Sequence, residues 1–158
     1  MTDHVSFGVP APLFDWPARA PAAVGRLQEM LVRSLGSLPE VGVDLVCGNA
    51  NGSHRLDACL LDVLTRVFGE AAARIALTSI KGAVGEFGAA GALSAVATCL
   101  ALRDQMVPPL CNLRRPPADV AFRLAAPIAA PRHLQHALMF SMARGGSTIA
   151  LLFRRPTA

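Results

Sequence analysis

Two stretches of the chain decide the fold, VDLVCGNANGSHRLD at residues 43–57 and ALTSIKGAVGEFGAAGALSAVATCLALRDQMVPPLCNL at residues 76–113. Each begins with a short apolar segment, passes through a polar or glycine-rich loop and continues into a helical pattern. Short apolar runs bounded by turn residues indicate buried strands, and apolar residues at spacings of three and four indicate helices. Strands that alternate with helices predict an α/β layered domain with a largely parallel sheet.

The predicted elements extend outward from these two stretches. Their order is helix, strand, helix, strand, helix and then an antiparallel hairpin around a glycine-containing loop. They are expected at about residues 22–35, 41–47, 54–68, 74–79 and 89–103, with hairpin strands at 136–142 and 148–154. The helix at 89–103 is apolar nearly all round, which is typical of a helix enclosed by other elements. A glycine-rich loop is expected at 81–88.

The N-terminal segment is expected to differ from the rest. Residues 1–20 contain Pro10, Pro12 and Pro17, and Pro21 follows directly. Because proline disfavours helix interiors and central strands, an extended arm is predicted over 1–20, with one short strand at Val5–Val9. Residues 21–158 then form a single domain.

Composition excludes several classes of protein. The chain has 158 residues, 53% hydrophobic and 16% charged, which excludes a disordered chain. No run of 18 apolar residues and no signal-peptide pattern is present, so no membrane association and a cytoplasmic location are expected. The net charge of +4 comes with scattered arginines, no Tyr and one Trp, so nucleic-acid binding is not expected.

The cysteines are predicted to be structural. Cys47, Cys59, Cys99 and Cys111 are too far apart for a CxxC pair, and disulfides are not expected. Cys59 and Cys99 fall in helical apolar runs and are expected to act as small buried hydrophobes. Cys47 is expected to be a buried strand residue beside a functional loop.

The histidines do not form a ligand set. His133 and His136 are three apart at a loop-to-strand boundary, and His54 is distant in the sequence. No nearby Asp, Glu or Cys completes a tetrahedral site, so neither a metal nor a cofactor is expected.

Three loops occupy the place where α/β domains carry function, beyond the carboxyl ends of strands, at 48–53, 80–88 and 143–147. Together with SMARGGSTIALLF (141–153), the two opening stretches resemble the C-terminal half of β-ketoacyl-acyl-carrier-protein synthases over about residues 41–154. The specific pattern is Ser-x-Lys, Gly-x-x-Gly and GAAG, followed by a long Ala-rich helix ending in LALRDQ and then VPPxxNL. The resemblance implies half of a thiolase-type fold, with layered helices and a mixed sheet.

The resemblance also implies a degenerate active site. The family's C-terminal half supplies two histidines and a lysine, and its nucleophilic cysteine lies in the other half. The lysine matches Lys81, whereas Asn49 takes the place of the first histidine and Asn51 that of a threonine. Glu86 takes the place of the second histidine, across a loop one residue shorter than the family's. The family's glycine-rich gating loop becomes Ala143-Arg144-Gly145-Gly146.

These departures predict a chain without a fully functional catalytic residue. Imidazole titrates near neutral pH, whereas Asn49 cannot titrate, and an ionised Glu86 would repel an oxyanion. An ion pair between Glu86 and a buried Lys81 is expected, in either a structural or a functional role.

The resemblance therefore implies an obligate homo- or hetero-oligomer. The partner expected is a ketosynthase-like chain, through which this chain would reach acyl carrier protein. In this hypothesis the chain is an accessory, chain-length-factor-like subunit that shapes an acyl tunnel in fatty-acid, polyketide or polyene biosynthesis. The alternative is the second half of a split synthase that contributes directly to Claisen condensation. A third possibility is a decayed gene fragment that still folds.

Overall fold

The computed structural model describes residues 2–8, 16–35, 42–142 and 147–156. A six-stranded sheet has the order β1-β8-β7-β2-β3-β5, and a small second sheet pairs β4 with β6. The strands are β1 (Thr2–Gly8), β2 (Leu45–Cys47), β3 (Ala76–Thr78), β4 (Met106–Val107), β5 (Arg123–Leu124), β6 (Ala130–Pro131), β7 (His136–Met142) and β8 (Ser147–Arg154). The helices are α1 (Trp16–Leu35), α2 (His54–Phe68), the 3-10 helix η2 (Gly69–Arg74), α3 (Lys81–Val84) and α4 (Ala90–Asp104).

The main sheet is mixed. Strand β2 runs parallel to both β3 and β7, and β3 runs parallel to β5. Strand β8 pairs antiparallel with β7 and with β1, in registers that place Ala150 opposite Phe140 and Val5. The predicted α/β layered fold is thus confirmed, with an antiparallel edge added to its parallel strands.

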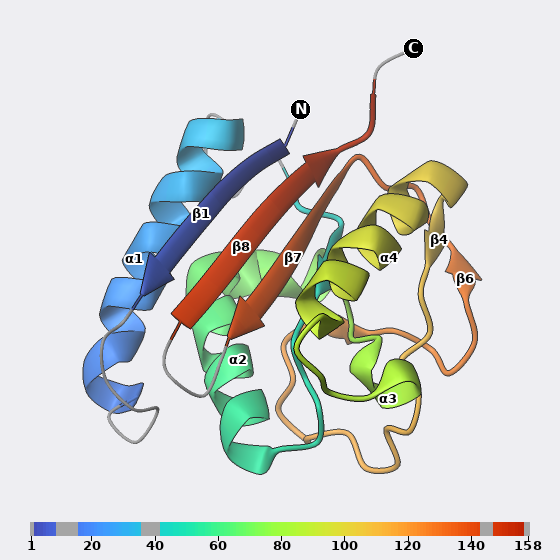
Figure 1. Ribbon diagram of the computed structural model, residues 1–158, viewed down its shortest axis with the longest axis horizontal. Helices are drawn as coiled ribbons and strands as arrows, with labels where there is room; N and C mark the ends of the chain where they lie inside the picture. The colour runs from blue at the N-terminus through green and yellow to red at the C-terminus, as the bar shows by residue number, and fades with distance from the viewer. Residues whose placement is uncertain (1, 9–15, 36–41, 143–146, 157–158) are drawn as a thin grey trace.

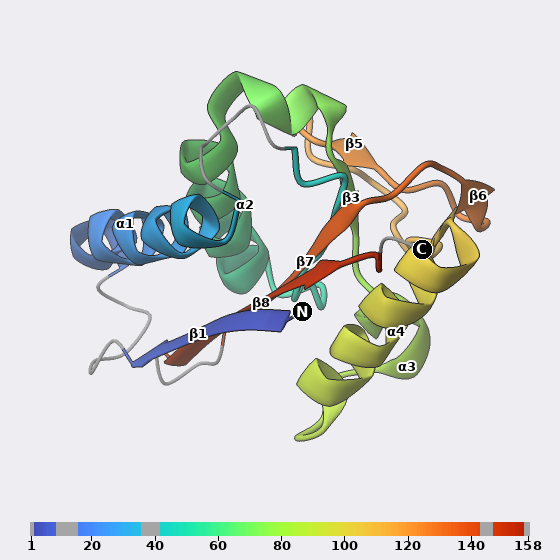
Figure 2. The ribbon, with the colours of Figure 1, turned by 90° about the horizontal axis from the view of Figure 1, so that it is seen from above.

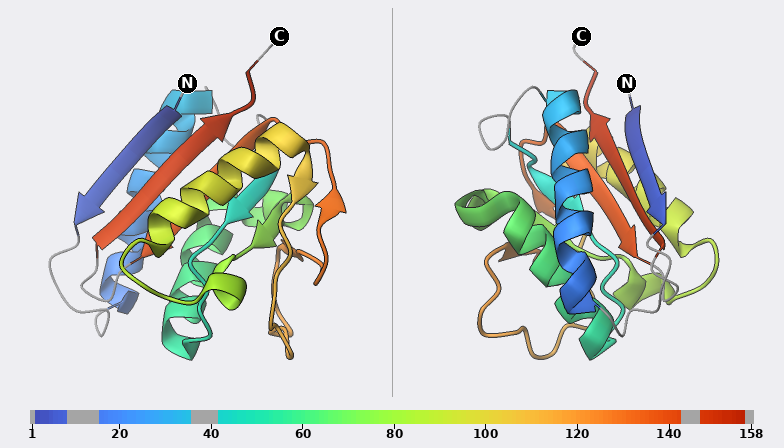
Figure 3. Two further views of the ribbon diagram at one scale, coloured as in Figure 1. Left: turned by 45° about the vertical axis from the view of Figure 1, so that its right-hand side comes forward. Right: turned by 90° about the vertical axis from the view of Figure 1, so that its left-hand side faces the viewer.

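Helices cover the sheet on both sides. Helices α1 and α2 lie together on one face, and α4 lies across the other (Figures 1, 2 and 3). The larger core lies on the first face, where Leu27 of α1 and Val63 and Leu64 of α2 are fully buried with Phe140 of β7. A smaller core under α4 contains Ala101 and Leu102 with Leu134 and Ala137.

The central elements match the sequence prediction closely. Helix α2 spans 54–68 as expected, because its apolar residues fall on one stripe and Gly69 follows at a positive φ of 51°. The hairpin strands β7 and β8 also fall where predicted. Strands β2 and β3 are shorter than the apolar runs that predict them, since only three residues of each pair in the sheet.

The structure corrects three expectations about secondary structure. Helix α1 begins at Trp16, so residues 16–20 are helical and the helix crosses the expected boundary at 20–21. Pro17 is tolerated because the first turn of a helix has no carbonyl partner for a backbone N–H. Residues 81–84, expected as loop, form the single-turn helix α3, and the proline-punctuated region after α4 contains the short strands β4, β5 and β6.

The arm expected over 1–20 is also partly a sheet element. Strand β1 covers residues 2–8 rather than 5–9 and pairs with β8 along its whole length. Val9 lies outside the described residues. Over the part of the chain that the structure describes, no helix is long and apolar enough to cross a membrane.

Candidate functional site

Two predicted loops meet at the carboxyl edge of the sheet. Asn49 and Asn51 follow β2, and Lys81 begins α3 shortly after β3. Because β2 and β3 are parallel neighbours, their following loops lie at the same edge of the sheet. A hydrogen bond of 2.6 Å from Ser79 Oγ to the Ala50 carbonyl joins the two loops directly.

Lys81 is the centre of this cluster. Its side chain is only 3% exposed, and its Nζ lies 2.5 Å from Oε2 of Glu86, whose side chain is 47% exposed. Nζ also donates a hydrogen bond to Oδ1 of Asn49. The predicted burial of Lys81 and its pairing with Glu86 are confirmed. Because Lys81 is buried and Glu86 is half-exposed, this ion pair lies at the border between protein and solvent.

Asn49 is held from the opposite side by the end of β7. Its Nδ2 donates to the Met142 carbonyl at 2.7 Å, and its Oδ1 accepts from Ser141 Oγ at 3.0 Å as well as from Lys81. The amide orientation is therefore fixed by three partners. Ser141 and Met142 were not predicted as site residues, although β7 is parallel to β2 and its carboxyl end therefore lies at this edge.

Asn51 completes the cluster. Its Nδ2 donates to Glu86 Oε2 at 2.9 Å, so this carboxylate oxygen accepts from both Asn51 and Lys81. Asp57, in the first turn of α2, fixes the loop by accepting the backbone N–H groups of Asn51 and Gly52 at 3.0 Å each. A carboxylate near a helix N-terminus is also favoured by the helix dipole.

Close packing fixes the position of α3. A Cβ added at Gly82 would overlap the carbonyl oxygen of Cys111, so only glycine fits there without a shift of backbone. Asn112 Nδ2 donates to the Gly82 carbonyl at 2.6 Å. Gly85 ends the helix at a φ of 82°, which turns the chain so that Glu86 can reach Lys81.

Cys47 lies beneath this cluster and faces α4. It is fully buried, as predicted, and burial raises the pKa of its thiol, an effect partly offset by contacts with Thr98, Ile80 and other groups. A raised pKa keeps the thiol protonated, which opposes reaction as a nucleophile.

Two other cysteine expectations were wrong. Cys99 is exposed and Cys59 is only half-buried. Cys99 lies on the outer face of α4, between Val96 and Leu100, so an apolar helix pattern did not specify which residues are covered.

The remaining predicted site residues lie elsewhere. The gating loop with Arg144, Gly145 and Gly146 falls outside the described residues. His133 bonds Gln135 at 3.2 Å rather than His136. Within the described ranges, no group of three or more His, Cys, Asp and Glu side chains could hold a metal ion.

The chemistry open to the cluster follows from its contacts. Asn49, Asn51, Lys81 and Glu86 supply amide, ammonium and carboxylate groups that bond to one another. None of these four residues carries an imidazole, the group that shuttles protons near neutral pH. Their hydrogen bonds and ion pair connect the loop after β2 with the residues after β3.

The mixed α/β fold matches that of thiolase-like ketosynthase structures. The family "Beta-ketoacyl synthase, C-terminal domain" matches residues 15–114, which is more than half of the chain, and the chain belongs to this family.

Curated relatives agree with this assignment. The chain is 34% identical over 134 residues to 3-oxoacyl-[acyl-carrier-protein] synthase 2 of Rhizobium meliloti (strain 1021), covering 84% of this chain and 31% of the relative. It is 32% identical over 115 residues to the putative polyketide beta-ketoacyl synthase 1 of Streptomyces cyaneus, covering 72% and 27%. The chain thus spans about a third of the length of the curated relatives it matches.

Solved structures share the fold. The AntDE:AntF complex, a type II PKS acyl-carrier protein in complex with its ketosynthase bound to the hexaketide, matches with a TM-score of 0.84 at 23% identity. That match covers 98% of this chain and 38% of the other. The ishigamide ketosynthase/chain length factor matches with a TM-score of 0.79 at 19% identity, covering 99% and 37%.

Proposed function

We propose that this chain is an accessory, non-catalytic subunit of a ketosynthase/chain-length-factor type complex in fatty-acid, polyketide or polyene biosynthesis. In this proposal it binds a ketosynthase-like partner in the cytoplasm and meets acyl carrier protein through that partner. Its contribution is to shape the wall of the tunnel that receives the acyl chain.

One observation carries the proposal. Asn49, which the family resemblance places at the first histidine, is fixed by Lys81, Ser141 and Met142, and Glu86 is held by Lys81 and Asn51. Condensing chemistry in the family uses imidazoles at these two positions. An amide cannot titrate and a carboxylate repels a developing oxyanion, so this arrangement supports a structural role for the site.

The outer face of α4 supports the need for a partner. Leu93, Val96 and Leu100 are exposed there, with Val96 at 54%, and no charged residue occurs between Glu86 and Arg103. A contiguous exposed apolar surface marks a protein interface. We call Leu93, Val96, Cys99 and Leu100 the α4 stripe, and we propose that the ketosynthase-like partner covers it.

The alternative role is direct participation in condensation as the second half of a split synthase. The presence of Lys81 and of the intact scaffold favours it. The two roles differ in one measurable property, since only a split enzyme gains condensation activity when it is combined with a chain that supplies the nucleophile.

The proposal is tested by acyl transfer. Incubation of the chain with an acyl thioester should give no stable adduct by intact-protein mass spectrometry, and malonyl-carrier protein should not lose CO₂. The variant Asn49→His should behave in the same way, because catalytic groups that act as a unit are strongly non-additive. A stable acyl adduct on Cys47 would overturn the non-catalytic role.

The same experiment on a complex separates the two roles. The partner is sought among the products of neighbouring genes, especially a carrier protein and a second ketosynthase-like chain. If a complex condenses only when this chain is present and loses activity in Lys81→Met while still assembling, the split-enzyme role is correct. If Lys81→Met leaves condensation unchanged, the accessory role is supported.

A further inference from the structure

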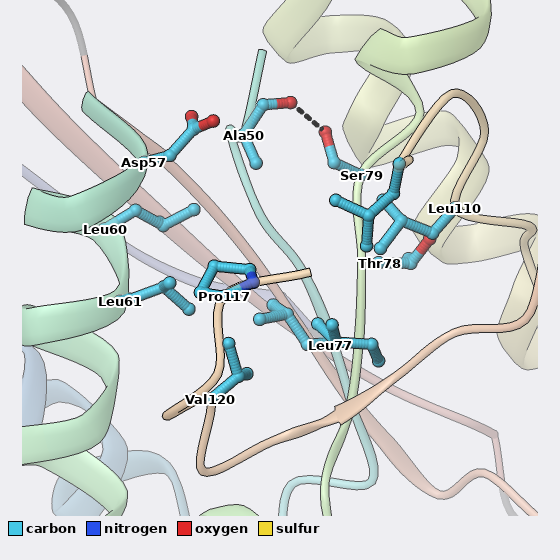
Figure 4. Close-up of a pocket in the computed structure, with 12 residues that line it drawn as sticks. Ala50, Asp57, Leu60, Leu61, Leu77, Thr78, Ser79, Leu110, Pro117 and Val120 are labelled. Atoms are coloured by element: carbon cyan, nitrogen blue, oxygen red, sulfur yellow. Dashed lines mark hydrogen bonds between the residues drawn. The ribbon is translucent and has the colours of Figure 1, made fainter. Parts of the chain in front are cut away.

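A small pocket lies between α2 and the segment that follows α4 (Figure 4). Helices α2 and α4 cover opposite faces of the sheet (Figure 2), so the pocket is on the side opposite the α4 stripe. The volume of this pocket is about 90 Å³. Side chains from α2, from β3 and its following residues, and from the loop at 110–124 line it. The lining residues are Ala50, Asp57, Leu60, Leu61, Leu77, Thr78, Ser79, Leu110, Leu113, Pro117, Val120 and Leu124.

The polar side chains of the pocket are already used. Asp57 accepts the backbone N–H groups of Asn51 and Gly52. Ser79 Oγ donates to the Ala50 carbonyl, as the dashed line in Figure 4 shows, and Thr78 Oγ1 donates to the Pro108 carbonyl at 2.9 Å. The other lining side chains are aliphatic, so the pocket offers a ligand dispersion contacts rather than hydrogen bonds.

These properties specify the chemistry of an occupant. A charged or hydrogen-bonding group would lose its hydration without a partner, which disfavours it strongly. An apolar cavity of about 150 Å³ takes up benzene, so the smaller space of about 90 Å³ here suits about three or four carbon atoms. The lining of leucine, valine and proline side chains offers no aromatic ring for stacking.

From this lining and volume we propose that the pocket binds the end of a saturated alkyl chain. The site is distinct from the Lys81–Glu86 cluster but adjoins it, because Ala50 and Ser79 line the pocket and their hydrogen bond joins the two loops that carry the cluster. It lies across the sheet from the α4 stripe. The inference therefore goes beyond the proposed function and does not depend on it.

A homologous series of 1-alkanols tests the proposal, since their hydroxyl can stay in solvent while the chain enters. Affinity for the full chain, measured by amide NMR titration, should rise about fourfold for each added methylene, the ratio given by about 0.8 kcal/mol per buried CH₂. The rise should stop once the pocket is full, between propanol and pentanol. The largest amide shifts are expected at Leu61, Leu77 and Val120.

Two variants fix the location of the binding. Val120→Phe fills the pocket and should lower hexanol affinity at least tenfold, whereas the matched Val32→Phe, on the exposed face of α1, should leave it unchanged. Leu113→Asp places a charge at the half-exposed rim without a large change in the core and should weaken binding similarly. Its matched control is Ile128→Asp, at a position that is 75% exposed.

Several results would overturn the proposal. These are affinity that rises through decanol without a plateau, equal effects of the pocket variants and their controls, or no binding at all. Tighter binding of benzene than of hexanol would overturn the assignment to an alkyl chain.

A parallel titration with S-acyl-pantetheines of the same acyl lengths distinguishes where the alkyl group comes from. Tighter binding of the thioester than of the matching alkanol supports an alkyl group that arrives on a carrier. Equal binding supports a free alkyl compound, and both results support the pocket.

Discussion

The two faces of the sheet differ in how completely the chain covers them. On the α1 and α2 face, helix side chains and strand side chains form a closed core in which Leu27, Leu64 and Phe140 are fully buried. On the α4 face, the core contains mainly small and medium side chains such as Ala101, Leu102 and Ala137, and the outside of the helix is apolar again. On the first face, the described residues bury the apolar side chains of the sheet and helices. On the second face, α4 is apolar on both its sides, as is typical of a helix covered by other elements on both sides.

This difference shows that an apolar residue on a helix is not always a buried one. Helix α2 has one apolar stripe, and that stripe is buried. Helix α4 is apolar nearly all round, yet the chain covers only the side with Ala90, Ser94, Thr98 and Ala101. Ser94 and Thr98 face this core with their hydroxyls bonded to the carbonyls of Ala90 and Ser94. Apolar residues on the other side add little to the stability of the isolated chain, since folding does not remove them from water.

The largest expected effect is therefore a core truncation on the first face. Leu64→Ala should lower the free energy of unfolding by about 2–5 kcal/mol, through lost burial and the cavity that remains. Val96→Ala, on the α4 stripe, should change it by less than about 0.5 kcal/mol. Urea unfolding followed by circular dichroism measures both. Similar losses in the two variants would remove the distinction between the faces.

The ion pair at the carboxyl edge should show an asymmetry of its own. Glu86→Gln leaves a buried ammonium without its counter-ion and should cost about 3 kcal/mol, the lower end for a broken buried pair. Lys81→Met leaves a half-exposed carboxylate that water can solvate and should cost about 1–2 kcal/mol. The double variant is the control, and its loss should be smaller than the sum of the two single losses. A larger loss from Lys81→Met would show that the side chain of Lys81 is needed mainly for packing.

A charge on the α4 stripe should affect assembly more than folding. Val96→Lys should weaken association at least about 30-fold, equivalent to about 2 kcal/mol, if the position is central in the interface. The unfolding free energy of the chain should stay within about 0.5 kcal/mol of the parent. Sedimentation velocity over a concentration range measures the first quantity. Val32→Lys, on the exposed face of α1, is the matched control. A parent chain that is a well-behaved monomer at micromolar concentration and binds no partner would contradict the interface.

The smallest effect concerns thiol reactivity on the two sides of α4. Burial raises the pKa of both the Cys47 and the Cys99 thiols, so access to reagent should decide their rates. Cys99 should be alkylated at the rate of an exposed thiol. Cys47 should be alkylated only at the rate at which the protein opens locally or unfolds. Peptide mass spectrometry after iodoacetamide treatment reports each site. Protection of Cys99 in the assembled complex would place it inside the interface. Rapid labelling of Cys47 would contradict its burial.

The parts of the fold that follow from local pattern were predictable from the sequence. The stripe of α2 and the alternating strands of the hairpin each bury one face, so their periods reveal them. The start of α1 at Trp16 was not predictable in this way, because it places Pro17 in the first turn but Pro21 inside the helix, where proline is unfavourable. The pairing of β1 with β8 joins the two ends of the chain, and a contact between such distant residues leaves no local signal.

The candidate site shows the same division. Lys81 and Glu86 are five residues apart, and their pairing followed from the family pattern together with the scarcity of lysine. The contacts of Asn49 with Ser141 and Met142 span more than 90 residues and depend on the order of strands in the sheet. Knowing that β7 lies beside β2 would have been enough to find them. The pocket beside α2 depends on how a proline-rich loop packs, which periodicity does not describe.

The contact at Gly82 has a mechanical consequence. The backbone of α3 rests directly against the carbonyl of Cys111, and Asn112 clasps the Gly82 carbonyl from the same loop. Because no side chain separates Gly82 from Cys111, a shift of the Cys111 backbone would push directly on the backbone of α3. Leu110 and Leu113, on either side of this contact, line the alkyl pocket, while Lys81, next to Gly82, holds the polar cluster. A shift of the loop at Cys111 and Asn112 by a fraction of an ångström would therefore displace Lys81, the only lysine of the sequence, through the contact at Gly82.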